Sequence, residues 1–225
     1  MTKNIIVAVD GPAGSGKSSV SKEVAKRCNL QYIDSGALYR SITWIVLQDQ
    51  GKVEQGMDFV EILSSKIIKQ EFFKTGECKT WVNEKDVSAL IRDEEITKNI
   101  GIISDDTAVR SYVNELLRTW AGSNSVIMDG RDIGSVVFPH AQVKIFIDAS
   151  VEVRARRRIK EYHEMGKKVD ENAIQNQIIQ RDKEDFSRPV GTLVQVEDAH
   201  YLDTSQMSKD EVINKIETII NPVKQ

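Results

Sequence analysis

A glycine-rich loop near the start of the chain has the residues and the spacing that bind phosphate. The segment Gly11-Pro12-Ala13-Gly14-Ser15-Gly16-Lys17-Ser18 matches the pattern G-x-x-x-x-G-K-[ST] in full. Its glycines allow backbone N–H groups to converge on an anion, and the helix that follows adds its positive end. We expect Lys17 to be exposed and to reach the β- and γ-phosphates, and Ser18 to ligate Mg²⁺. The loop therefore predicts a site for a nucleoside triphosphate.

An apolar run that ends in an aspartate is a second candidate for nucleotide chemistry. Val126, Ile127 and Met128 have the pattern of a buried strand, and Asp129 follows them. A carboxylate at such a strand end can hold Mg²⁺ through a water molecule. The alternative is an aspartate that merely starts a turn, and the pattern alone leaves both interpretations open.

Arginines form the third group of candidates. Phosphoryl transfer places negative charge on the migrating group, and a phosphate acceptor adds repulsion between two polyanions. A kinase with such an acceptor therefore needs several arginines, some of them on segments that close over the substrates. The candidates are Arg40, Arg110, Arg131, Arg154, Arg157, Arg158, Arg181 and Arg188, accompanied by the carboxylates Asp132 and Asp185.

The spacing of these residues places several of them on the same face of a helix and one at the end of a strand. Arg131 directly follows the predicted strand that ends at Asp129, and the carboxyl ends of parallel strands line the ligand crevice. Arg154 and Arg158 are four residues apart and share a helix face. A second shared face is formed by Arg181, Asp185 and Arg188. A solvated charged face is the alternative for each arginine, and it is weakest for Arg131.

Alternating strands and helices are expected to position these residues. Short apolar runs have the pattern of buried parallel strands, and amphipathic helical patterns lie between them. The predicted strands cover residues 5–9, 30–33, 126–128 and 143–147, with a weaker fifth near Tyr201 and Leu202. This pattern indicates an α/β fold with a five-stranded parallel sheet flanked by helices.

Capping residues mark several helix ends. Ser35 is expected to cap the helix that follows the second strand. Asp105 or Asp106 is expected to cap a helix that ends before Gly122. The segment Ser208-Lys209-Asp210-Glu211 forms a capping box for the last helix.

Two stretches interrupt the alternation and are predicted to be subdomains. Residues 51–103 contain a helix-like piece over 59–68 and then a hairpin, which together indicate an insertion. Residues 154–190 are polar and rich in arginine, as expected of a mobile charged lid. The core would then comprise residues 1–50, 104–153 and 191–225.

Composition argues against several other classes of protein. The chain has 31 Lys and Arg against 34 Asp and Glu, a formal net charge of -3, whereas broad nucleic-acid binding needs a basic surface. Cys28 and Cys78 are not in a CxxC pair and the histidines are scattered, so no zinc spacing exists. The apolar run at the N-terminus is too short for a signal peptide or a membrane span. We therefore expect a cytoplasmic monomer without nucleic-acid or membrane partners.

The motifs together resemble those of bacterial cytidylate kinases. The phosphate-binding loop is followed in order by DSGALYR, DGRDIGSVVFP, VKIFIDAS and RDKEDFSR, and the similarity runs nearly end to end. The resemblance implies a P-loop NTPase core with an inserted domain that binds the nucleoside monophosphate, and a short helical lid. It also implies transfer of the γ-phosphoryl group of ATP to CMP or dCMP, with Mg²⁺ as the metal.

The resemblance also implies which residues form each site. The ATP site would comprise Gly11, Pro12, Ala13, Gly14, Ser15, Gly16, Lys17, Ser18 and Ser19, with Arg154 against the adenine and Arg158 near the phosphates. The CMP site would comprise Ser35, Gly36, Arg40, Arg110, Arg131, Asp132, Asp185 and Arg188. The catalytic group would comprise Lys17, Arg131, Arg181 and Arg188.

Within the CMP site the resemblance implies finer roles. Arg110 and Asp185 would contact the cytosine or sugar edge, Arg131 would hold the phosphate, and Asp132 would contact the pentose. One position departs from the family pattern, because Gly101 stands where a serine usually contacts cytosine.

Three other functions are weighed against this one. A UMP/CMP kinase, or another nucleoside monophosphate kinase of broader base specificity, would differ in acceptor kinetics. A GTPase switch would need an NKxD-type guanine motif, which the sequence lacks. A non-catalytic ATP-binding regulator would not explain a second cluster of arginines suited to a second phosphate.

Overall fold

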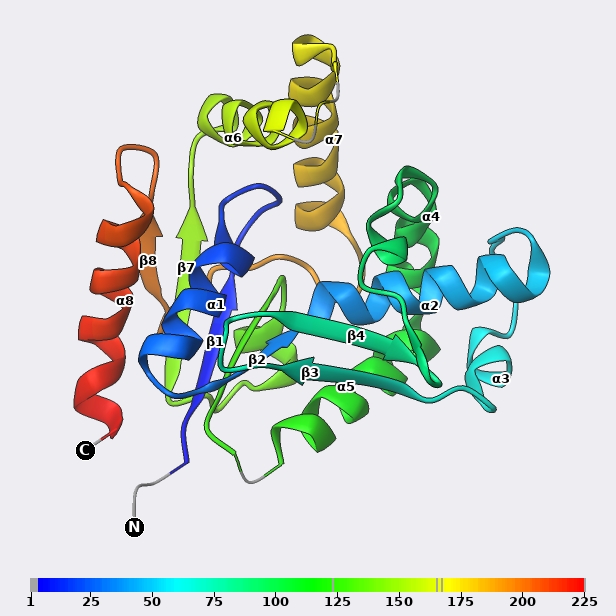
Figure 1. The fold of residues 1–225 in the computed structure, drawn as a ribbon, viewed down its shortest axis with the longest axis horizontal. Coiled ribbons are helices and arrows are strands. Elements are labelled where there is room, and N and C mark those ends of the chain that lie inside the picture. The colour runs from blue at the N-terminus through cyan, green and yellow to red at the C-terminus, as the bar shows by residue number, and fades with distance from the viewer. Residues whose placement is uncertain (1–3, 123, 165, 167, 225) are drawn as a thin grey trace.

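The larger of two sheets lies at the centre of the fold and is entirely parallel (Figure 1). The computed structural model describes residues 4–122, 124–164, 166 and 168–224. The five strands have the order β2-β6-β1-β7-β8, so the strand before the phosphate-binding loop is central. Their bounds are β1 (Ile6–Asp10), β2 (Gln31–Asp34), β6 (Val126–Gly130), β7 (Val143–Asp148) and β8 (His200–Asp203). The predicted α/β fold and five-stranded sheet are confirmed.

Helices cover both faces of this sheet, as the alternation of strand side chains requires. Val7 and Val9 of β1 pack with helices α1 and α8, whereas Ala8 packs on the opposite face with α2 and α5. The helices are α1 (Lys17–Arg27), α2 (Ser35–Gln50), α5 (Thr107–Ala121) and α8 (Lys209–Lys224). The strands β2, β6, β1 and β7 are therefore buried on both sides, whereas β8 at the edge is largely exposed, and the carboxyl edge of the sheet is left for a site.

Most of the predicted helix ends are confirmed. The Asp106 side chain accepts a hydrogen bond from the Val109 backbone N–H at the start of α5, and Gly122 ends that helix with a φ of 47°. At the start of α8, the Glu211 carboxylate accepts from the Ser208 backbone N–H at 2.8 Å, as in a capping box. Ser35 is an exception, because Asp34 caps α2 and Ser35 is the first helical residue.

The inserted segment contains a small antiparallel sheet. Its strands β3 (Ile68–Phe72), β4 (Cys78–Val82) and β5 (Lys85–Asp86) follow the short helix α3 (Phe59–Leu63) and precede the turn η1 (Leu90–Arg92) and helix α4 (Glu94–Asp105). The predicted hairpin is thus present. The helix predicted over 59–68 is too long, because Ile68 pairs with Val82 in the sheet instead of continuing the helix. The exact limits of the insertion stay a prediction, and α4 runs past residue 103.

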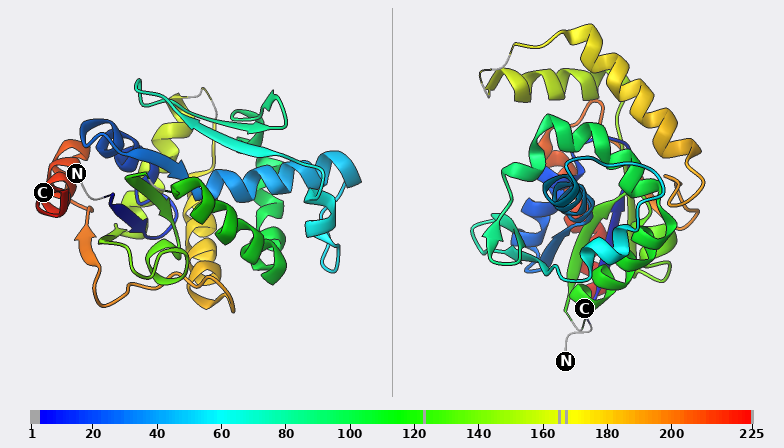
Figure 2. Two further views of the ribbon diagram at one scale, coloured as in Figure 1. Left: turned by 90° about the horizontal axis from the view of Figure 1, so that it is seen from below. Right: turned by 90° about the vertical axis from the view of Figure 1, so that its right-hand side faces the viewer.

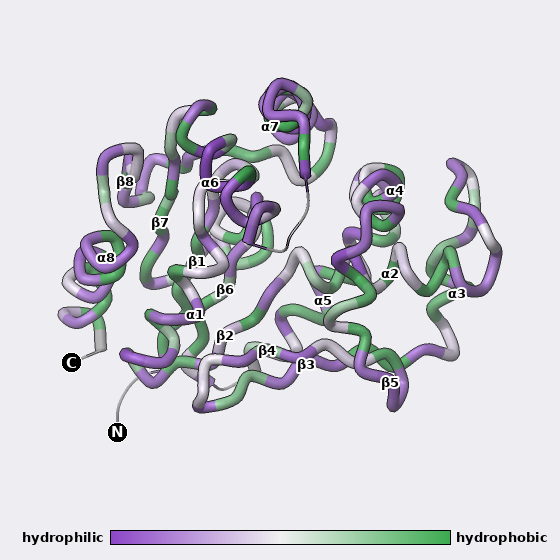
Figure 3. The backbone as a smooth tube through the Cα atoms, turned by 45° about the horizontal axis from the view of Figure 1, so that its top comes forward, coloured by the Kyte–Doolittle hydropathy of each residue, from purple (hydrophilic) through white to green (hydrophobic). Residues whose placement is uncertain are grey.

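The polar arm consists of two packed helices, α6 (Val151–Glu164) and α7 (Glu171–Ser187). Ala155 of α6 packs against Ile174 and Ile178 of α7 in a small cluster of their own. Figure 2 shows the two helices projecting together from the sheet, and Figure 3 colours much of their length hydrophilic. The arm is therefore a helical hairpin, held together by few apolar side chains.

None of the helices in the described part of the chain is long and apolar enough to cross a bilayer.

Candidate active site

The phosphate-binding loop joins β1 to α1 at the carboxyl edge of the sheet, as predicted. Gly11 begins it with a φ of 148°, and a Cβ at this position would lie 2.0 Å from the Ile147 carbonyl oxygen of β7. Gly16 ends it in the left-handed region with a φ of 90°. Only glycine fits these two positions, so the backbone turns tightly enough for its N–H groups to surround an anion.

Lys17 is buried, not exposed as the sequence predicts. Its side chain lies inside the loop, where Nζ donates to the Pro12 carbonyl oxygen at 2.8 Å and to Ser15 Oγ at 3.4 Å. Burial, followed by the nearby charge of Arg131, lowers the pKa of Lys17 to about 7. The loop therefore holds a cation that water solvates poorly, and an incoming phosphate would stabilise its charged form.

Asp129 at the end of β6 lies beside the loop and is bound from both sides. Ser18 Oγ donates to its Oδ2 at 2.6 Å, and the Tyr32 hydroxyl donates to its Oδ1 at 2.6 Å. Burial, and then the charge of Asp34, raises the pKa of Asp129. Sequence reasoning missed Tyr32, which it treated as one more apolar residue of β2. No local signal marks this contact, because it depends on the pairing of β2 with β6, in which Tyr32 is opposite Ile127, two residues before Asp129.

Ser18 and Asp129 suit a Mg²⁺ ion that is bound together with a nucleotide, rather than a metal ion held by protein side chains alone. Within the described residues no group of three His, Cys, Asp or Glu side chains could hold a metal ion. Mg²⁺ keeps several waters and takes its remaining oxygens from phosphates and one or two side chains, such as Ser18 and Asp129. The donor set therefore suits a magnesium–nucleotide complex.

Ser35 and Gly36 lie at the amino end of α2, next to Asp129. The Ser35 hydroxyl donates to the Asp129 carbonyl oxygen at 2.6 Å, which ties α2 to the end of β6. The Asp34 side chain performs the capping that the sequence assigns to Ser35, accepting from the Ala37 N–H at 2.8 Å. A Cβ on Gly36 would lie 3.4 Å from Asp34 Oδ1, so this turn is closely packed.

Arg40 lies on α2, facing the insertion and the arm. Its guanidinium donates to Thr97 Oγ1 at 2.9 Å and to the Ile91 carbonyl oxygen at 3.2 Å. Burial, followed by the charge of Arg92, lowers the pKa of Arg40 to about 10; Asp34 opposes this, and Arg158 and Arg181 of the arm add smaller contributions. Positive charges on the insertion and the arm therefore act on Arg40, and an anion bound near it would favour its charged form.

Arg110 and Asp132 form a buried ion pair. Arg110 Nη1 lies 2.9 Å from Asp132 Oδ2, and each side chain is 8% exposed. Arg110 also donates from Nε to the Ser104 carbonyl oxygen at 2.6 Å. A Cβ on Gly191 would lie 1.7 Å from Arg110 Nη1, so the chain after the arm passes directly over this guanidinium. The pair is thus fixed in place between α5 and the loop after β6.

Asp185 is surrounded by arginines. Arg131 Nε donates to Asp185 Oδ2 at 2.6 Å, and Arg188 and Arg181 lie 3.1 Å and 3.4 Å from Oδ1. Arg188 also pairs with Asp105 at 3.1 Å, which joins α7 to α4. Among the described residues, Asp185 Oδ1 and Arg188 Nε make no well-aligned hydrogen bond despite these short distances. The cluster therefore retains polar atoms that can bind a ligand.

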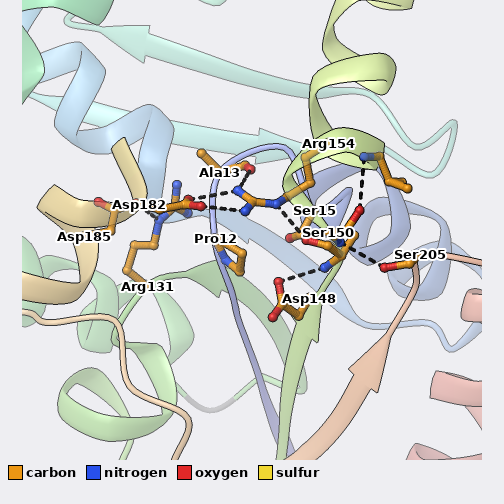
Figure 4. Close-up of polar contacts among 12 residues, drawn as sticks. Pro12, Ala13, Ser15, Arg131, Asp148, Ser150, Arg154, Asp182, Asp185 and Ser205 are labelled. Atoms are coloured by element: carbon orange, nitrogen blue, oxygen red, sulfur yellow. Dashed lines mark hydrogen bonds and ion pairs between the residues drawn. The ribbon is translucent and has the colours of Figure 1, made fainter. Parts of the chain in front are cut away.

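Arg154 connects the arm to the phosphate-binding loop (Figure 4). It donates from Nη1 to the Ala13 carbonyl oxygen at 3.0 Å, and its two Nη atoms bind both oxygens of Asp182 on α7. Arg157, which the sequence placed only beside its neighbours, donates to the Ser15 carbonyl oxygen at 3.1 Å. The base of the arm is therefore anchored to the loop by two arginines.

Two predicted residues lie away from these contacts. Arg158 is 44% exposed and stacks on the Tyr162 ring at 5.0 Å, so its role at the phosphates stays a prediction. Ser19 is exposed, and its hydroxyl donates to the Gly16 carbonyl oxygen at 3.1 Å. The side chains that do meet at the carboxyl edge are Lys17, Ser18, Asp129, Ser35, Arg131, Asp185, Arg181, Arg188, Arg110 and Asp132.

Comparisons with known proteins agree on one family. The family model described as cytidylate kinase matches residues 7–222. The cytidylate kinase of Listeria innocua is 42% identical over 217 residues, which cover 96% of each chain. The cytidylate kinase of an Exiguobacterium species is 39% identical over 224 residues, which cover 100% of each chain.

Solved structures of distant proteins have the same fold. An uncharacterised protein from Eubacterium ventriosum superposes with a TM-score of 0.55 at 14% identity, over 97% of this chain and 99% of that one. A gluconokinase from Sinorhizobium meliloti superposes with a TM-score of 0.51 at 13% identity, over 100% of this chain and 95% of that one. At such identities the likeness concerns the fold alone.

Proposed function

The chain belongs to the cytidylate kinase family, and we propose that it transfers the γ-phosphoryl group of ATP to CMP or dCMP at the carboxyl edge of the sheet. The products are ADP and CDP or dCDP. One observation supports this location above the others. In the pairing of β1 with β6, Asp10 is opposite Gly130, so the phosphate-binding loop and the loop that carries Arg131 begin side by side. Two phosphate sites next to each other are what transfer between two nucleotides requires.

The donor site would be formed by the loop from Gly11 to Ser18, with Ser19 at the start of α1. Backbone N–H groups of the loop and the amino end of α1 would bind the β- and γ-phosphates. Lys17 already lies inside the loop, where its ammonium would neutralise charge on the transferring group. Arg154 would pack against the adenine from the base of the arm, since it already touches the loop at Ala13.

Magnesium would be held by the Ser18 hydroxyl and, through water, by Asp129. Held there, the metal would supply positive charge that neutralises part of the charge of the phosphates. The Tyr32 hydroxyl fixes the Asp129 carboxylate from the other side, so its orientation is set before any nucleotide arrives.

The acceptor site would lie between α2, the loop after β6 and the arm. Arg131 would bind the CMP phosphate, with Ser35, Gly36 and Arg40 on the α2 side. Arg110, Asp132 and Asp185 would form the wall that contacts the sugar and base. Of these residues, Arg110 and Asp132 are already held rigidly by their mutual ion pair, which favours a fixed orientation of the acceptor.

Arg181 and Arg188 would complete the site from the arm. Both lie against Asp185 in this structure, and a phosphoryl group carries more charge than a carboxylate. We expect the guanidinium groups to turn toward the phosphates when both nucleotides are bound, stabilising the equatorial oxygens. Closure of the arm would also exclude water and so limit hydrolysis of ATP.

The direct test is product identification. Purified protein is incubated with ATP labelled at the γ-phosphate, Mg²⁺ and CMP, and labelled CDP is separated by chromatography. We expect labelled CDP with the wild type and none above background with Lys17→Ala, because the variant lacks the charge inside the loop. Labelled phosphate without labelled CDP would mean an ATPase, and the proposed function would then be wrong.

We further propose that the protein acts as a monomer in the cytoplasm. The residues proposed for the acceptor and donor sites all come from one chain, which favours catalysis by a single copy. Sedimentation equilibrium at working concentrations tests this, and a dimer whose dissociation abolishes turnover would contradict it.

A further inference from the structure

Asp10 is a buried carboxylate to which the mechanism above gives no role. It is the last residue of β1, directly before the phosphate-binding loop, and it is 6% exposed. Its Oδ1 accepts the Ile133 backbone N–H at 2.9 Å, and its Oδ2 accepts the Gly134 backbone N–H at 2.7 Å. Both bonds reach across the sheet to a segment more than 120 residues later in the chain.

The segment that Asp10 holds begins the π-helical turn η2 (Ile133–Val137). Arg131 and Asp132 stand between this turn and β6, so the short loop that carries them is fixed at both ends. At one end Gly130 pairs with Asp10 in the sheet, and at the other end the Asp10 carboxylate binds two N–H groups. The backbone of the loop that carries Arg131 and Asp132 is therefore restrained at both ends by Asp10, next to the phosphate-binding loop.

The packing around this contact is close. A Cβ on Gly134 would lie 3.3 Å from Asp10 Oδ2 and 3.3 Å from Lys144 Cδ, so the turn approaches the carboxylate as far as a glycine allows. Burial raises the pKa of Asp10 to about 6, against the effect of the two N–H donors and of Lys17, while Asp132 raises it further. A buried carboxylate is costly to keep, and a function for it would explain its presence.

We propose that Asp10 is a positioning residue that fixes the loop of Arg131 and Asp132 against the phosphate-binding loop, and so sets the distance between the acceptor and donor phosphates. This inference rests on the proposed function, because only a kinase that binds both nucleotides has such a distance between phosphates. Asp10 itself touches neither nucleotide in this account. It acts through the backbone of Ile133 and Gly134, and a change at Asp10 should thus affect the acceptor more than the donor.

The first experiment measures the contact without any reaction. Amide hydrogen exchange is followed by NMR in the wild type and in Asp10→Asn, which keeps one oxygen acceptor and loses the other. We expect exchange of the Ile133 or Gly134 amide to accelerate by roughly tenfold or more, as the loss of one buried hydrogen bond implies. The amide of Met128 within β6 serves as the internal reference and should keep its rate. Unchanged exchange at both Ile133 and Gly134 would overturn the proposal.

The second experiment separates acceptor from donor. We expect Asp10→Asn to lower kcat/KM for CMP by about tenfold or more, while the Kd for ATP without CMP changes less than twofold. Asp148→Asn is the matched control, since Asp148 ends the neighbouring strand β7. Among the described residues, its carboxylate accepts only from the adjacent Ala149 N–H at 2.7 Å and from the Tyr201 hydroxyl at 3.4 Å. Equal losses for ATP and CMP, or equal losses in the two variants, would overturn the proposal.

A third variant guards against a folding defect. Gly134→Ala leaves Asp10 in place but pushes a methyl group against its Oδ2. We expect kcat/KM for CMP to fall selectively, by less than in Asp10→Asn. A larger effect on the Kd for ATP than on kcat/KM for CMP would contradict the proposal. If the wild type failed to phosphorylate CMP, the proposed function would fall, whereas the exchange experiment would still decide whether Asp10 holds the loop.

Discussion

Arg131 donates a 2.6 Å hydrogen bond from Nε to Oδ2 of Asp185, although the two residues lie 54 positions apart in the sequence. Arg131 belongs to the loop after β6 and Asp185 to α7, so the bond joins the core to the arm. Arg181 and Arg188 approach the other oxygen of the same carboxylate. Asp185 thus occupies the place of an anion among three arginines, where a nucleotide phosphate would compete with it.

Asp185→Asn should destabilise the free protein at neutral pH. Burial alone would raise the pKa of Asp185, but Arg131, Arg181 and Arg188 hold it below its usual value. A lowered pKa means that the stabilisation is present above the unfolded-state pKa of about 4 and is lost as the pH falls below it. We expect the variant to lose roughly 1–3 kcal/mol in urea denaturation at pH 7. The difference from wild type should shrink at pH 3, and a constant difference would contradict the assignment.

Lys17 should take up a proton when ATP binds. Burial lowers the pKa of Lys17 to about 7, so most of the free protein carries a neutral amine at pH 8. The phosphates of ATP favour the charged ammonium and should restore it, with net uptake of protons at that pH. Calorimetric titration in two buffers of different ionisation enthalpy measures this uptake. Lys17→Met is the control and should show none, whereas identical heats for wild type in both buffers would contradict the prediction.

Arg188→Ala should lower kcat more than it raises the KM for ATP. Arg188 is 8% exposed and contacts Asp105 and Asp185, so it is not a solvated helix-face residue. If its charge acts on the transferring group, its removal should cost about 10²–10³-fold in kcat. Arg156→Ala, at an exposed arginine of α6, is the matched control and should leave both constants unchanged. An unchanged kcat in Arg188→Ala would remove Arg188 from the mechanism.

Local signals allowed most of the fold to be predicted. The apolar runs before Gly11 and Asp129 are strands, and Asp106, Gly122 and Ser208 mark helix ends, because each of these effects acts within a few residues. Asp34 and Ser35 are both good capping residues and adjacent in the chain, so the sequence pattern does not distinguish the Asp34 cap of the structure from the predicted Ser35 cap.

The contacts between side chains in the site are harder to predict from the sequence. Asp182 binds Arg154 across two helices, and Tyr32 binds Asp129 across two strands, so neither pairing has a local sequence pattern. A place in a loop favours an exposed Lys17, but the loop folds around its side-chain nitrogen. Such tertiary arrangements depend on which segments meet, and one sequence alone does not encode them in its spacing.

Gly101→Ser should stabilise the protein and sharpen its choice of base. Gly101 lies inside α4, and a Cβ there would meet no heavy atom within 4 Å. Serine is a better helix former than glycine, so we expect a gain of roughly 0.5 kcal/mol in the free energy of unfolding. In cytidylate kinases, which this chain resembles, a serine at this position usually contacts cytosine. The added hydroxyl should therefore also raise the ratio of kcat/KM for CMP to that for UMP. Gly101→Ala isolates the stability effect, and an equal ratio in both variants would show that the hydroxyl does not contact the base.

The choice of acceptor tests the central claim most directly. ADP release is coupled to a spectrophotometric signal, and kcat/KM is measured for CMP, dCMP, UMP, AMP and GMP under identical conditions at fixed ATP and Mg²⁺. We predict the highest value for CMP or dCMP, a lower value for UMP, and the lowest values for the two purine nucleotides. A higher kcat/KM for UMP, AMP or GMP than for both cytidine nucleotides would contradict the account.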